Sequence, residues 1–350
     1  MRKILSAVFL ACIFSCGGVA LAAEEGAQKA VLITGATTGI GRMAAERLAA
    51  HGYFVYAGAR KASDIEELNK IENIQAVRLD VTAQEEIDAA VAHIREEGRG
   101  LWGLVNNAGV NVVGPLIEFA DEDFDFLFDV NVRGVFSVTK AFAPLIIESQ
   151  GRIVNISSVA GIGTGAAYGP YSMTKHAIEA FTDALAEELE VTGVTVAGVE
   201  PGSYSSAIGL TRCKRMLAKA DASASAYWAE MMKDHIDYCK ERISPDYKSS
   251  APEPVAVAAA IEHALFADKT SDFIFYINLW QAYHEQKKEL SNNQLRKWCK
   301  THFIAWLRMR EWIDTWQQIR NMLREQKLKF NTSPADYDAI HRSLLTGLLS

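Results

Sequence analysis

Short apolar strands alternate with helices along much of the chain, and this alternation restricts the fold more than any other feature. The strand-like runs are rich in β-branched residues and lie at 31–35, 53–58, 76–80, 103–106, 152–157 and 195–200. Residues with helical periodicity fill the intervals at 42–51, 63–71, 83–97, 122–149 and 172–192. The pattern loosens over 203–254, and a last helix is expected at 255–267. Repeated βαβ units predict an α/β fold with a doubly wound parallel (Rossmann-like) sheet, which binds ligands at the carboxyl ends of its strands.

A glycine-rich loop joins the first predicted strand to the first predicted helix. It reads TGATTGIG over 34–41 and contains Gly35, Gly39 and Gly41. Glycine allows the backbone to approach a diphosphate closely, and a helix N-terminus offers unpaired N–H groups and a positive potential. Ordinary strand-to-helix turns also use glycine, but the position directly after the first strand favours a dinucleotide site.

The second predicted strand ends at a basic residue, where NAD sites usually carry a carboxylate. The sequence there is Gly58-Ala59-Arg60-Lys61. The planar guanidinium of Arg60 suits a ribose 2′-phosphate, so we expect NADP(H) to be preferred, with NAD(H) as the alternative cofactor. The competing interpretation is that Arg60 is simply an exposed basic residue at a strand end.

A tyrosine and a lysine stand four positions apart in the YSMTK stretch, residues 171–175. Positions i and i+4 share one face of a helix, so we expect Tyr171 and Lys175 to point into the same cleft. A free tyrosine has a pKa of about 10. A nearby lysine, together with an oxidised nicotinamide, would lower that pKa towards the range in which acid–base exchange is efficient. Taken alone, such a pair is more often an ordinary feature of a helix surface.

Seven motifs in the correct order resemble the short-chain dehydrogenase/reductase family over about residues 29–268. They are TGATTGIG, LDV at 79–81, NNAG at 106–109, DVNVRG around Asn131, NISS at 155–158, the Tyr171–Lys175 pair, and PG at 201–202. The stretches GPYSMTKHAIEAFTDALAEEL and VEPGSY are similar to the hydroxysteroid and retinol dehydrogenase branch. The resemblance implies an NADP(H)-dependent oxidoreductase that interconverts a carbonyl and an alcohol by hydride transfer.

The resemblance implies four catalytic residues. Tyr171 would be the acid/base, and Ser158 would orient the carbonyl. Lys175 would hold the nicotinamide ribose, and Asn131 would hold a water that resupplies protons. The implied catalytic set is Asn131, Ser158, Tyr171 and Lys175.

The same resemblance implies a larger set of cofactor contacts. These are Gly35, Thr37, Gly39, Ile40, Gly41, Arg60, Asp80, Val81, Asn107, Gly109, Lys175, Pro201, Gly202 and Ser206. Within this set Asp80 and Val81 would meet the adenine ring. Ser206 would replace the threonine that in related chains often bonds the carboxamide.

Partners follow from the resemblance and from the charge. The family implies a small apolar carbonyl or alcohol substrate, such as a steroid, retinoid or lipid-like alcohol, and a homo-oligomer. The formal net charge of −7 argues against a nucleic-acid binder as a whole.

We expect no metal site and interpret the cysteines as buried or incidental thiols, because no two have metal-ligand spacing. The cysteines are Cys12, Cys16, Cys213, Cys239 and Cys299.

Residues 1–25 have the layout of a secretory signal peptide: a basic start, an apolar run and small residues that include Ala20-Leu21-Ala22. Residues 4–23 are also long enough for an uncleaved membrane anchor, and Cys16 ends a loose lipoprotein box. A mis-assigned start codon is the remaining interpretation. We therefore expect an exported or membrane-anchored protein. The cytoplasmic alternative stays open, because nicotinamide cofactors are cytoplasmic.

The segment 271–350 differs in composition from the rest of the chain. It holds five of the seven tryptophans, and its twelve Lys or Arg outnumber its eight Asp or Glu. SDF, NNQLRKWCKTHFIAWLRMREW and DYDAIHRSLLTGLLS resemble a helical region of bacterial DEAH-box RNA helicases. Apolar residues recur every three or four positions from Leu295 to Leu323, which predicts an all-α segment. The chain has neither a phosphate-binding helicase loop nor a DEAH box, so unwinding activity is not implied.

Two alternatives depend on this segment. Aromatic residues interleaved with Arg and Lys would suit RNA, although such a stripe is more commonly core. The alternative function is a non-catalytic fusion protein whose C-terminal helices bind RNA or a partner protein. A true fusion, an assembly error and a recombinant junction all fit the sequence. We also expect FIFYI, at 273–277, to form the closing edge strand of the sheet.

Overall fold

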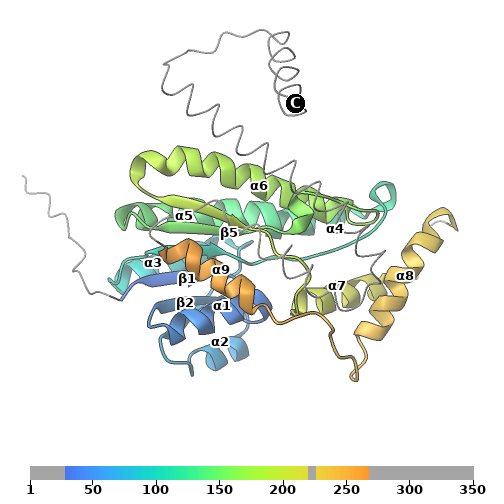
Figure 1. Cartoon of the computed structure of the whole chain (residues 1–350), viewed down its shortest axis with the longest axis horizontal. Helices are drawn as coiled ribbons and strands as arrows, with labels where there is room; N and C mark the ends of the chain where they lie inside the picture. The colour runs from blue at the N-terminus through green and yellow to red at the C-terminus, as the bar shows by residue number, and fades with distance from the viewer. Residues whose placement is uncertain (1–27, 220–225, 268–350) are drawn as a thin grey trace, which may run out of the picture. The chain divides into compact units, whose positions relative to one another are not determined.

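The computed structural model describes residues 28–219 and 226–267. In this part of the chain six parallel strands form one sheet in the order β3-β2-β1-β4-β5-β6 (Figure 1). The strands are β1 (Ala30–Ile33), β2 (Phe54–Ala59), β3 (Ile74–Arg78), β4 (Gly103–Asn106), β5 (Arg152–Ile156) and β6 (Thr195–Val199). The α-helices are α1 (Gly39–Ala50), α2 (Ala62–Leu68), α3 (Gln84–Glu96), α4 (Asp121–Phe128), α5 (Gly134–Glu148), α6 (Gly169–Leu189), α7 (Ala207–Ala218), α8 (Ala226–Arg242) and α9 (Val255–Phe266). The predicted doubly wound fold is confirmed.

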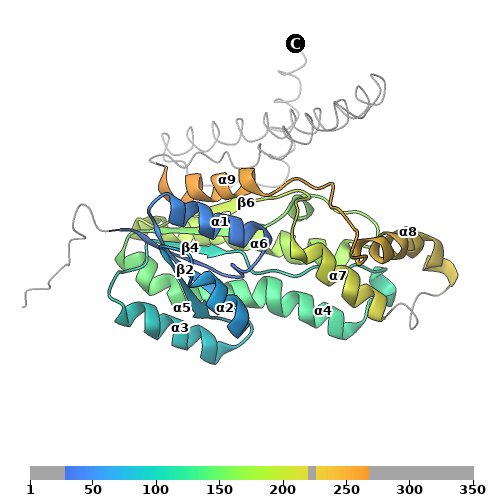
Figure 2. The same cartoon turned by 90° about the horizontal axis from the view of Figure 1, so that it is seen from below.

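Helices cover both faces of the sheet, which explains why the strands are almost purely apolar (Figure 2). On one face α1, α2 and α9 pack around Leu48, Leu68 and Ile261. On the other face α3 and α5 pack around Ile94 and Phe142, and α6 adds partly buried leucines. Burying one such side chain stabilises the fold by roughly 1.5–3 kcal/mol. Both layers therefore fix the strand ends, where most of the predicted site residues lie.

The predicted helix over 122–149 is two helices joined by a π-helical turn, which corrects its shape. α4 ends at Phe128, the π-helical turn spans Asp129–Arg133, and α5 begins at Gly134. The wider turn buries Asn131, whose side chain is only 1% exposed. Such turns are rare inside helices and occur frequently at functional sites. The periodicity of the sequence cannot reveal one widened turn inside a continuous helical run.

Two helices occupy the segment in which the sequence predicts no regular element. α7 and α8 pack against each other at one end of the sheet (Figure 1). Cys213 of α7 and Cys239 of α8 are both buried and form a disulfide bond. These two cysteines are therefore buried, as one of the two interpretations has it, but they are disulfide-bonded and not thiols. A pairing across 26 residues has no signature in a chain of this length.

Other sequence-based expectations concern residues outside the described part of the chain. These are the leader 1–25, the tail 271–350, the strand 273–277, Cys12, Cys16 and Cys299. Among the described helices, the run Asp121–Glu148 is long and apolar enough to cross a membrane, but half of its apolar window is buried inside the fold. Because this run packs against α3 and β4, we assign it to the core. No cluster of three metal-ligating side chains occurs in 28–219 or 226–267.

Candidate functional site

The predicted site residues gather at the carboxyl ends of the central strands. The chain leaves β1 towards β2, and it leaves β4, the other neighbour of β1, in the opposite direction towards β5, so the loops after β1 and β4 diverge. In open α/β sheets a ligand crevice forms at this topological switch point. The loops after β5 and β6 complete the same end of the sheet.

The glycine loop after β1 has a backbone that only glycine adopts without strain. Gly35 and Gly39 have positive φ angles of 64° and 56°. A Cβ on Gly35 would lie 2.9 Å from the Cα of Ala108, and a Cβ on Gly39 would lie 2.6 Å from the Cβ of Ser206. A Cβ on Gly41 would collide with the Asn107 side chain. The loop is therefore a closely packed cradle that larger residues would fill.

The N-terminus of α1 opens directly from this loop. Its N-cap residue, Thr38, is extended and makes no side-chain cap to the helix. The first turn of a helix leaves its N–H groups without intrahelical partners, and the helix dipole adds positive potential there. A diphosphate fits this arrangement, with Thr37, Ile40 and the three loop glycines beside it.

A hydrogen-bonded link between the loops after β1 and β4 supports the cradle. Asn107 donates from Nδ2 to the carbonyl oxygens of Thr34 (2.8 Å) and Gly35 (3.0 Å). The Thr34 hydroxyl accepts from the backbone N–H groups of Asn107 and Ala108, both at 3.0 Å. The structure thus gives Asn107 a supporting place against the loop. This role of Thr34 was not predicted, although Thr34 is the first residue of the TGATTGIG motif.

Arg60 and Asp80 meet where β2 and β3 end. The Arg60 side chain is 66% exposed, and its Nη1 lies 3.4 Å from Oδ2 of Asp80. Burial opposes ionisation of Asp80, but hydrogen bonds from Thr82 and the charge of Arg60 outweigh it and hold the pKa of Asp80 below its ordinary value. Asp80 is therefore a firmly ionised carboxylate, and Arg60 presents an exposed cation at the position expected for the 2′ side of the ribose.

Tyr171 and Ser158 face each other at the entrance to α6. Tyr171 lies in the first turn of α6, 8% exposed, and packs with Val112 and Leu127. Ser158 follows β5 and hydrogen-bonds the Tyr171 hydroxyl. The Ser158 hydroxyl also donates to the carbonyl oxygen of Pro201 at 3.4 Å. One apolar recess thus holds both hydroxyls that the sequence analysis placed beside the reacting carbonyl.

Lys175 lies one turn further along α6 and is 6% exposed. Its Nζ donates to the carbonyl oxygen of Ile156 at 2.9 Å and lies 5.8 Å from the centre of the Tyr171 ring. A Cβ on Gly109 would lie 3.8 Å from this Nζ, so Gly109 is next to it. The expected common face of Tyr171 and Lys175 is present.

The acid–base properties of the protein itself differ from the expectation for Tyr171. Burial raises the pKa of Tyr171 to about 12, although Ser158 and then Arg212 act to lower it. Burial lowers the pKa of Lys175 to about 8, and Glu179 opposes that shift. The predicted lowering of the phenol's pKa by Lys175 is therefore not produced by this chain's own groups. The reason is that removal from water favours the neutral form of both side chains.

Asn131 acts as a clamp in this structure. Its Oδ1 accepts from the Val110 N–H at 2.8 Å, and its Nδ2 donates to the Val110 carbonyl at 2.9 Å and to the Thr174 hydroxyl at 3.1 Å. These contacts tie the π-helical turn to the loop after β4 and to α6. The predicted role of Asn131 in holding a water stays a prediction.

The remaining predicted cofactor contacts are spread around the crevice. Pro201 is buried, and Gly202 follows it directly after β6. Ser206 occupies the N-cap position of α7 without a side-chain cap hydrogen bond and lies against Gly39, so it reaches the glycine loop. Val81 is 8% exposed, and a Cβ on Gly134 would lie 2.7 Å from it. Val81 therefore belongs to the core below the crevice, and its contact with adenine stays a prediction.

A buried polar chain beneath the site was missed by the sequence analysis. Asn106 Nδ2 donates to Thr139 Oγ1 and to Asn155 Oδ1, both at 2.8 Å. Asn155 Nδ2 then donates to Thr182 Oγ1 at 2.9 Å. Asn106 and Asn155 are also register partners in the sheet, so the chain aligns the ends of β4 and β5. The sequence features that could have indicated this chain are the first asparagine of NNAG, Asn106, and the asparagine of NISS, Asn155.

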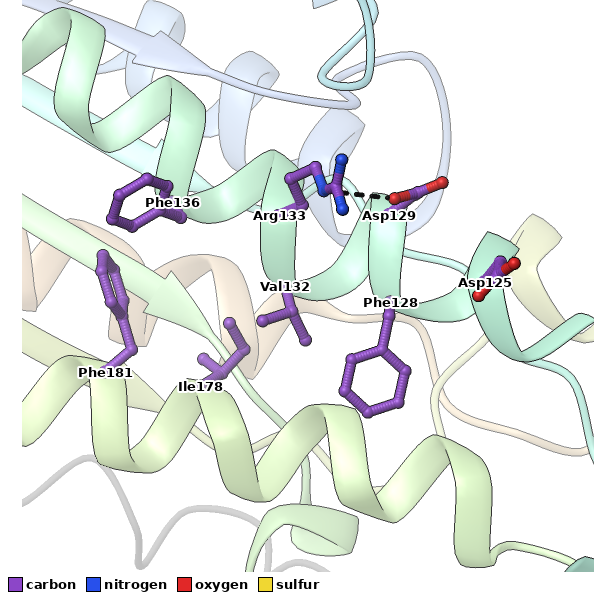
Figure 3. Close-up of a pocket in the computed structure, with 8 residues that line it drawn as sticks. All are labelled: Asp125, Phe128, Asp129, Val132, Arg133, Phe136, Ile178 and Phe181. Carbon is purple, nitrogen blue, oxygen red and sulfur yellow. Dashed lines mark ion pairs between the residues drawn. The ribbon is translucent and has the colours of Figure 1, made fainter. Parts of the chain in front are cut away.

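A separate hollow lies on the outer surface between α4, α5 and α6 (Figure 3). None of the four predicted catalytic residues lines it. Phe136 and Phe181 face each other across it in an edge-to-face arrangement, and Arg133 pairs with Asp129 at its rim. Its lining is Asp125, Phe128, Asp129, Val132, Arg133, Phe136, Ile178 and Phe181.

Comparisons with known proteins agree with this architecture. The family described as short chain dehydrogenase matches residues 29–216. The mitochondrial D-beta-hydroxybutyrate dehydrogenase of Bos taurus is 36% identical over 258 residues, covering 69% of this chain and 74% of the relative. Retinol dehydrogenase 16 of Homo sapiens is 35% identical over 253 residues, covering 69% and 78%.

Solved structures give the same result. A short-chain dehydrogenase from Streptomyces avermitilis has a TM-score of 0.60 at 25% identity and covers 84% of this chain and 98% of its own. ElxO with NADP bound has a TM-score of 0.55 at 27% identity, covering 71% and 94%. An actinorhodin polyketide ketoreductase with NADPH has a TM-score of 0.55 at 31% identity, covering 69% and 91%. The chain belongs to the short-chain dehydrogenase/reductase family.

Proposed function

We propose that the protein is an NADP(H)-dependent oxidoreductase that interconverts a carbonyl and an alcohol, with Tyr171 as the acid/base. The observation that carries the proposal is the Tyr171 hydroxyl, which is buried, hydrogen-bonded to Ser158 and followed one turn later by Lys175. The glycine cradle and the uncapped start of α1 fit a dinucleotide diphosphate at the same end of the sheet.

Each residue of the site has a task in carbonyl reduction. The cofactor, when bound, supplies a hydride to the carbonyl carbon. Tyr171 donates its proton to the carbonyl oxygen, and Ser158 orients that oxygen by a hydrogen bond. The Lys175 ammonium, held by the Ile156 carbonyl, favours the phenolate that remains. In alcohol oxidation the same groups act in reverse, so Tyr171 accepts the proton.

The cofactor preference rests on Arg60. An exposed guanidinium at the end of β2 offers a bidentate partner for a 2′-phosphate. Related structures contain NADP, NADPH or NADH, so the choice is a proposal about this chain. Calorimetric titration of the purified protein with NADPH and NADH tests it. Tighter binding of NADPH is expected, and tighter binding of NADH would refute the role of Arg60.

An apolar substrate body fits the walls above Tyr171. Val112 and Leu127 pack against the tyrosine, and Val113 and Met232 form a second apolar cluster nearby, which shares Tyr168. The relatives named for retinol and for D-beta-hydroxybutyrate support an alcohol attached to a carbon chain as substrate. Reduction of a panel of ketones, followed by consumption of NADPH, tests the reaction. If no ketone is reduced, the activity is not that of a carbonyl reductase.

We also propose export or membrane anchoring through the leader and assembly into a homo-oligomer. A disulfide such as Cys213–Cys239 persists in oxidising compartments, which supports export.

The outer hollow between α4, α5 and α6 supports assembly, because Phe136 is 52% exposed beside acidic and basic side chains. Under a two-fold axis, Arg133 of one copy would approach the acidic residues of the other. Fractionation of cells and light scattering of the purified protein test these two proposals.

A further inference from the structure

Arg212 is an unneutralised cation close to the reacting hydroxyl. It lies on α7, and its charge acts on the phenol of Tyr171. Its Nη1 donates to the Tyr168 hydroxyl at 2.7 Å. Its Nε is buried and has no hydrogen-bond partner within the described residues. A buried guanidinium nitrogen without a partner is costly, so an acceptor from outside the chain would stabilise it.

Two cations close to Arg212 in sequence are neutralised within the fold, namely Arg215 of α7 and Lys219 at its C-cap, whereas Lys214 of α7 is exposed. Arg215 and Lys219 both pair with the carboxylate of Asp123, Lys219 at 2.9 Å. Among the described residues Arg212 forms no ion pair, and its guanidinium carbon instead lies 5.9 Å and 5.5 Å from the ring centres of Tyr168 and Tyr238. Contacts with aromatic rings help to position a guanidinium and leave its charge available to an anion.

The surroundings of Arg212 describe the ligand. Tyr168 packs both against the apolar cluster around Tyr171 and against the cluster of Val113, Ala167 and Met232, so Arg212, bonded to its hydroxyl, lies beside two apolar clusters. His235 packs edge-to-face on Tyr168, with ring centres 5.9 Å apart. The disulfide at the next residue, Cys213, ties this part of α7 to α8. This region therefore places the Arg212 cation beside apolar side chains, with Tyr168 linking it to the cluster that contains Tyr171.

We propose that Arg212 binds an acidic group of the substrate, so that the enzyme acts on an oxo acid or hydroxy acid with an apolar body. The carboxylate accepts hydrogen bonds from the guanidinium, which places the carbonyl carbon chain across the mouth of the Tyr171 recess. Tyr168 is a positioning residue, because its hydroxyl holds Nη1. This inference rests on the proposed oxidoreductase function and narrows its substrate from any apolar ketone to one that carries an acid.

The test compares acids with uncharged esters. Acetoacetate and levulinate, each beside its methyl ester, are assayed for NADPH-dependent reduction by the wild type and by Arg212→Met. We expect the ratio of kcat/KM for acid over ester to fall by ~10- to 100-fold, which corresponds to one charge-assisted hydrogen bond. Arg212→Lys should restore part of the ratio, because it returns the charge without the planar fork.

A matched control removes a charge from the same helix. Arg215→Met deletes a cation three residues away that Asp123 already neutralises, and the acid-to-ester ratio should stay within twofold of the wild type. Tyr168→Phe should lower the ratio in the same direction as Arg212→Met. An unchanged ratio in both Arg212 variants would overturn the inference, while ketone reduction would still support the enzyme.

Calorimetric binding of the same acids and esters needs no turnover. It therefore tests the carboxylate contact of Arg212 separately from the reductase activity. If Arg212→Met loses the binding of the acids, Arg212 binds the substrate carboxylate. This conclusion holds even if neither compound is reduced, and in that case only the proposed reductase function is refuted. Equal binding of the acids by the wild type and by Arg212→Met would refute the role of Arg212 in binding the carboxylate. Melting temperatures identify variants that are misfolded or unstable. If Arg212→Met is one of them, the comparison of acid and ester binding is made with Arg212→Lys.

Discussion

Burial favours the neutral forms of the phenol and the amine at the centre of the site, although Lys175 is still mainly an ammonium at neutral pH. Burial raises the pKa of Tyr171 to about 12 and lowers the pKa of Lys175 to about 8. At neutral pH the phenol is therefore protonated and ready to donate, which suits carbonyl reduction. In the oxidation direction the phenol has to lose its proton first, and the positive charge of the oxidised nicotinamide helps there.

Glu200, immediately after β6, makes the stability of the fold depend on pH. Burial, followed by the charge of Glu179, raises the pKa of Glu200 to about 7 from an ordinary 4.5. Between these pH values the folded protein keeps a proton that the unfolded chain releases. The free energy of unfolding therefore falls as the pH rises from about 4.5 to about 7, and this contribution is constant above that range.

Glu200→Gln should remove this pH dependence. We expect the free energy of unfolding to rise by about 2 kcal/mol at about pH 8 and to change little at about pH 4. Urea denaturation at the two pH values measures it. Glu188→Gln removes an exposed carboxylate of α6 and should show no such contrast. An equal effect of Glu200→Gln at both pH values would contradict the assigned proton.

Arg60→Ala should weaken the binding of NADPH about tenfold and leave NADH binding within twofold. The reason is that only NADPH carries the phosphate with which an exposed guanidinium forms charge-assisted hydrogen bonds. Isothermal titration with each cofactor measures both constants. Arg78→Ala removes another exposed arginine, at the end of β3, and serves as the control. A parallel loss of both cofactors would assign Arg60 to general support of the loop.

At the scale of elements, the strands and their parallel arrangement could be predicted, because their residues are almost purely apolar and alternate with helices. A strand such as β1, AVLI, is apolar throughout, since helices cover both of its faces. The glycine loop and Arg60 followed from the ends of those strands, whereas the role of Ser158 was implied by the family resemblance. α7 and α8 could not be predicted, because their packing depends on each other and on the Cys213–Cys239 bond.

The parts of the site that the sequence did not reveal depend on three-dimensional neighbours. The raised pKa of Tyr171 comes from its burial, which no spacing of residues records. The clamp made by Asn131 requires the π-helical turn, and periodicity gives the same signal for a continuous helix. Arg212 has no motif around it, and only its place beside Tyr168 gives it a role.

The disulfide between α7 and α8 should contribute substantially to stability. Closing a loop of this size restricts the unfolded chain, and removing the bond should lower the free energy of unfolding by about 3 kcal/mol. Urea denaturation of the oxidised protein, with and without reductant, measures the loss. The Cys213→Ser/Cys239→Ser double variant should be insensitive to reductant. Equal unfolding midpoints of the oxidised protein in both conditions would show that the bond does not form in solution.

At the scale of the whole molecule, the face formed by α4, α5 and α6 should join two copies of the chain. Phe136→Asp places a charge where we expect an apolar contact, so it should shift the protein towards monomer by at least tenfold in the dissociation constant. Light scattering after gel filtration measures the mass. Val255→Asp changes an apolar side chain of similar exposure (51%) on α9 and should leave the mass unchanged. A monomeric wild type would contradict this assembly.

The whole account depends on one proton passing between Tyr171 and the substrate oxygen. Tyr171→Phe keeps the ring in its apolar recess and removes only the hydroxyl, so the fold and NADPH binding should persist. The direct measurement is the turnover number for a ketone that the wild type reduces, with NADPH affinity determined on the same samples. We expect kcat to fall by roughly 100- to 10,000-fold while NADPH binding stays within threefold. Undiminished turnover by Tyr171→Phe would contradict the account.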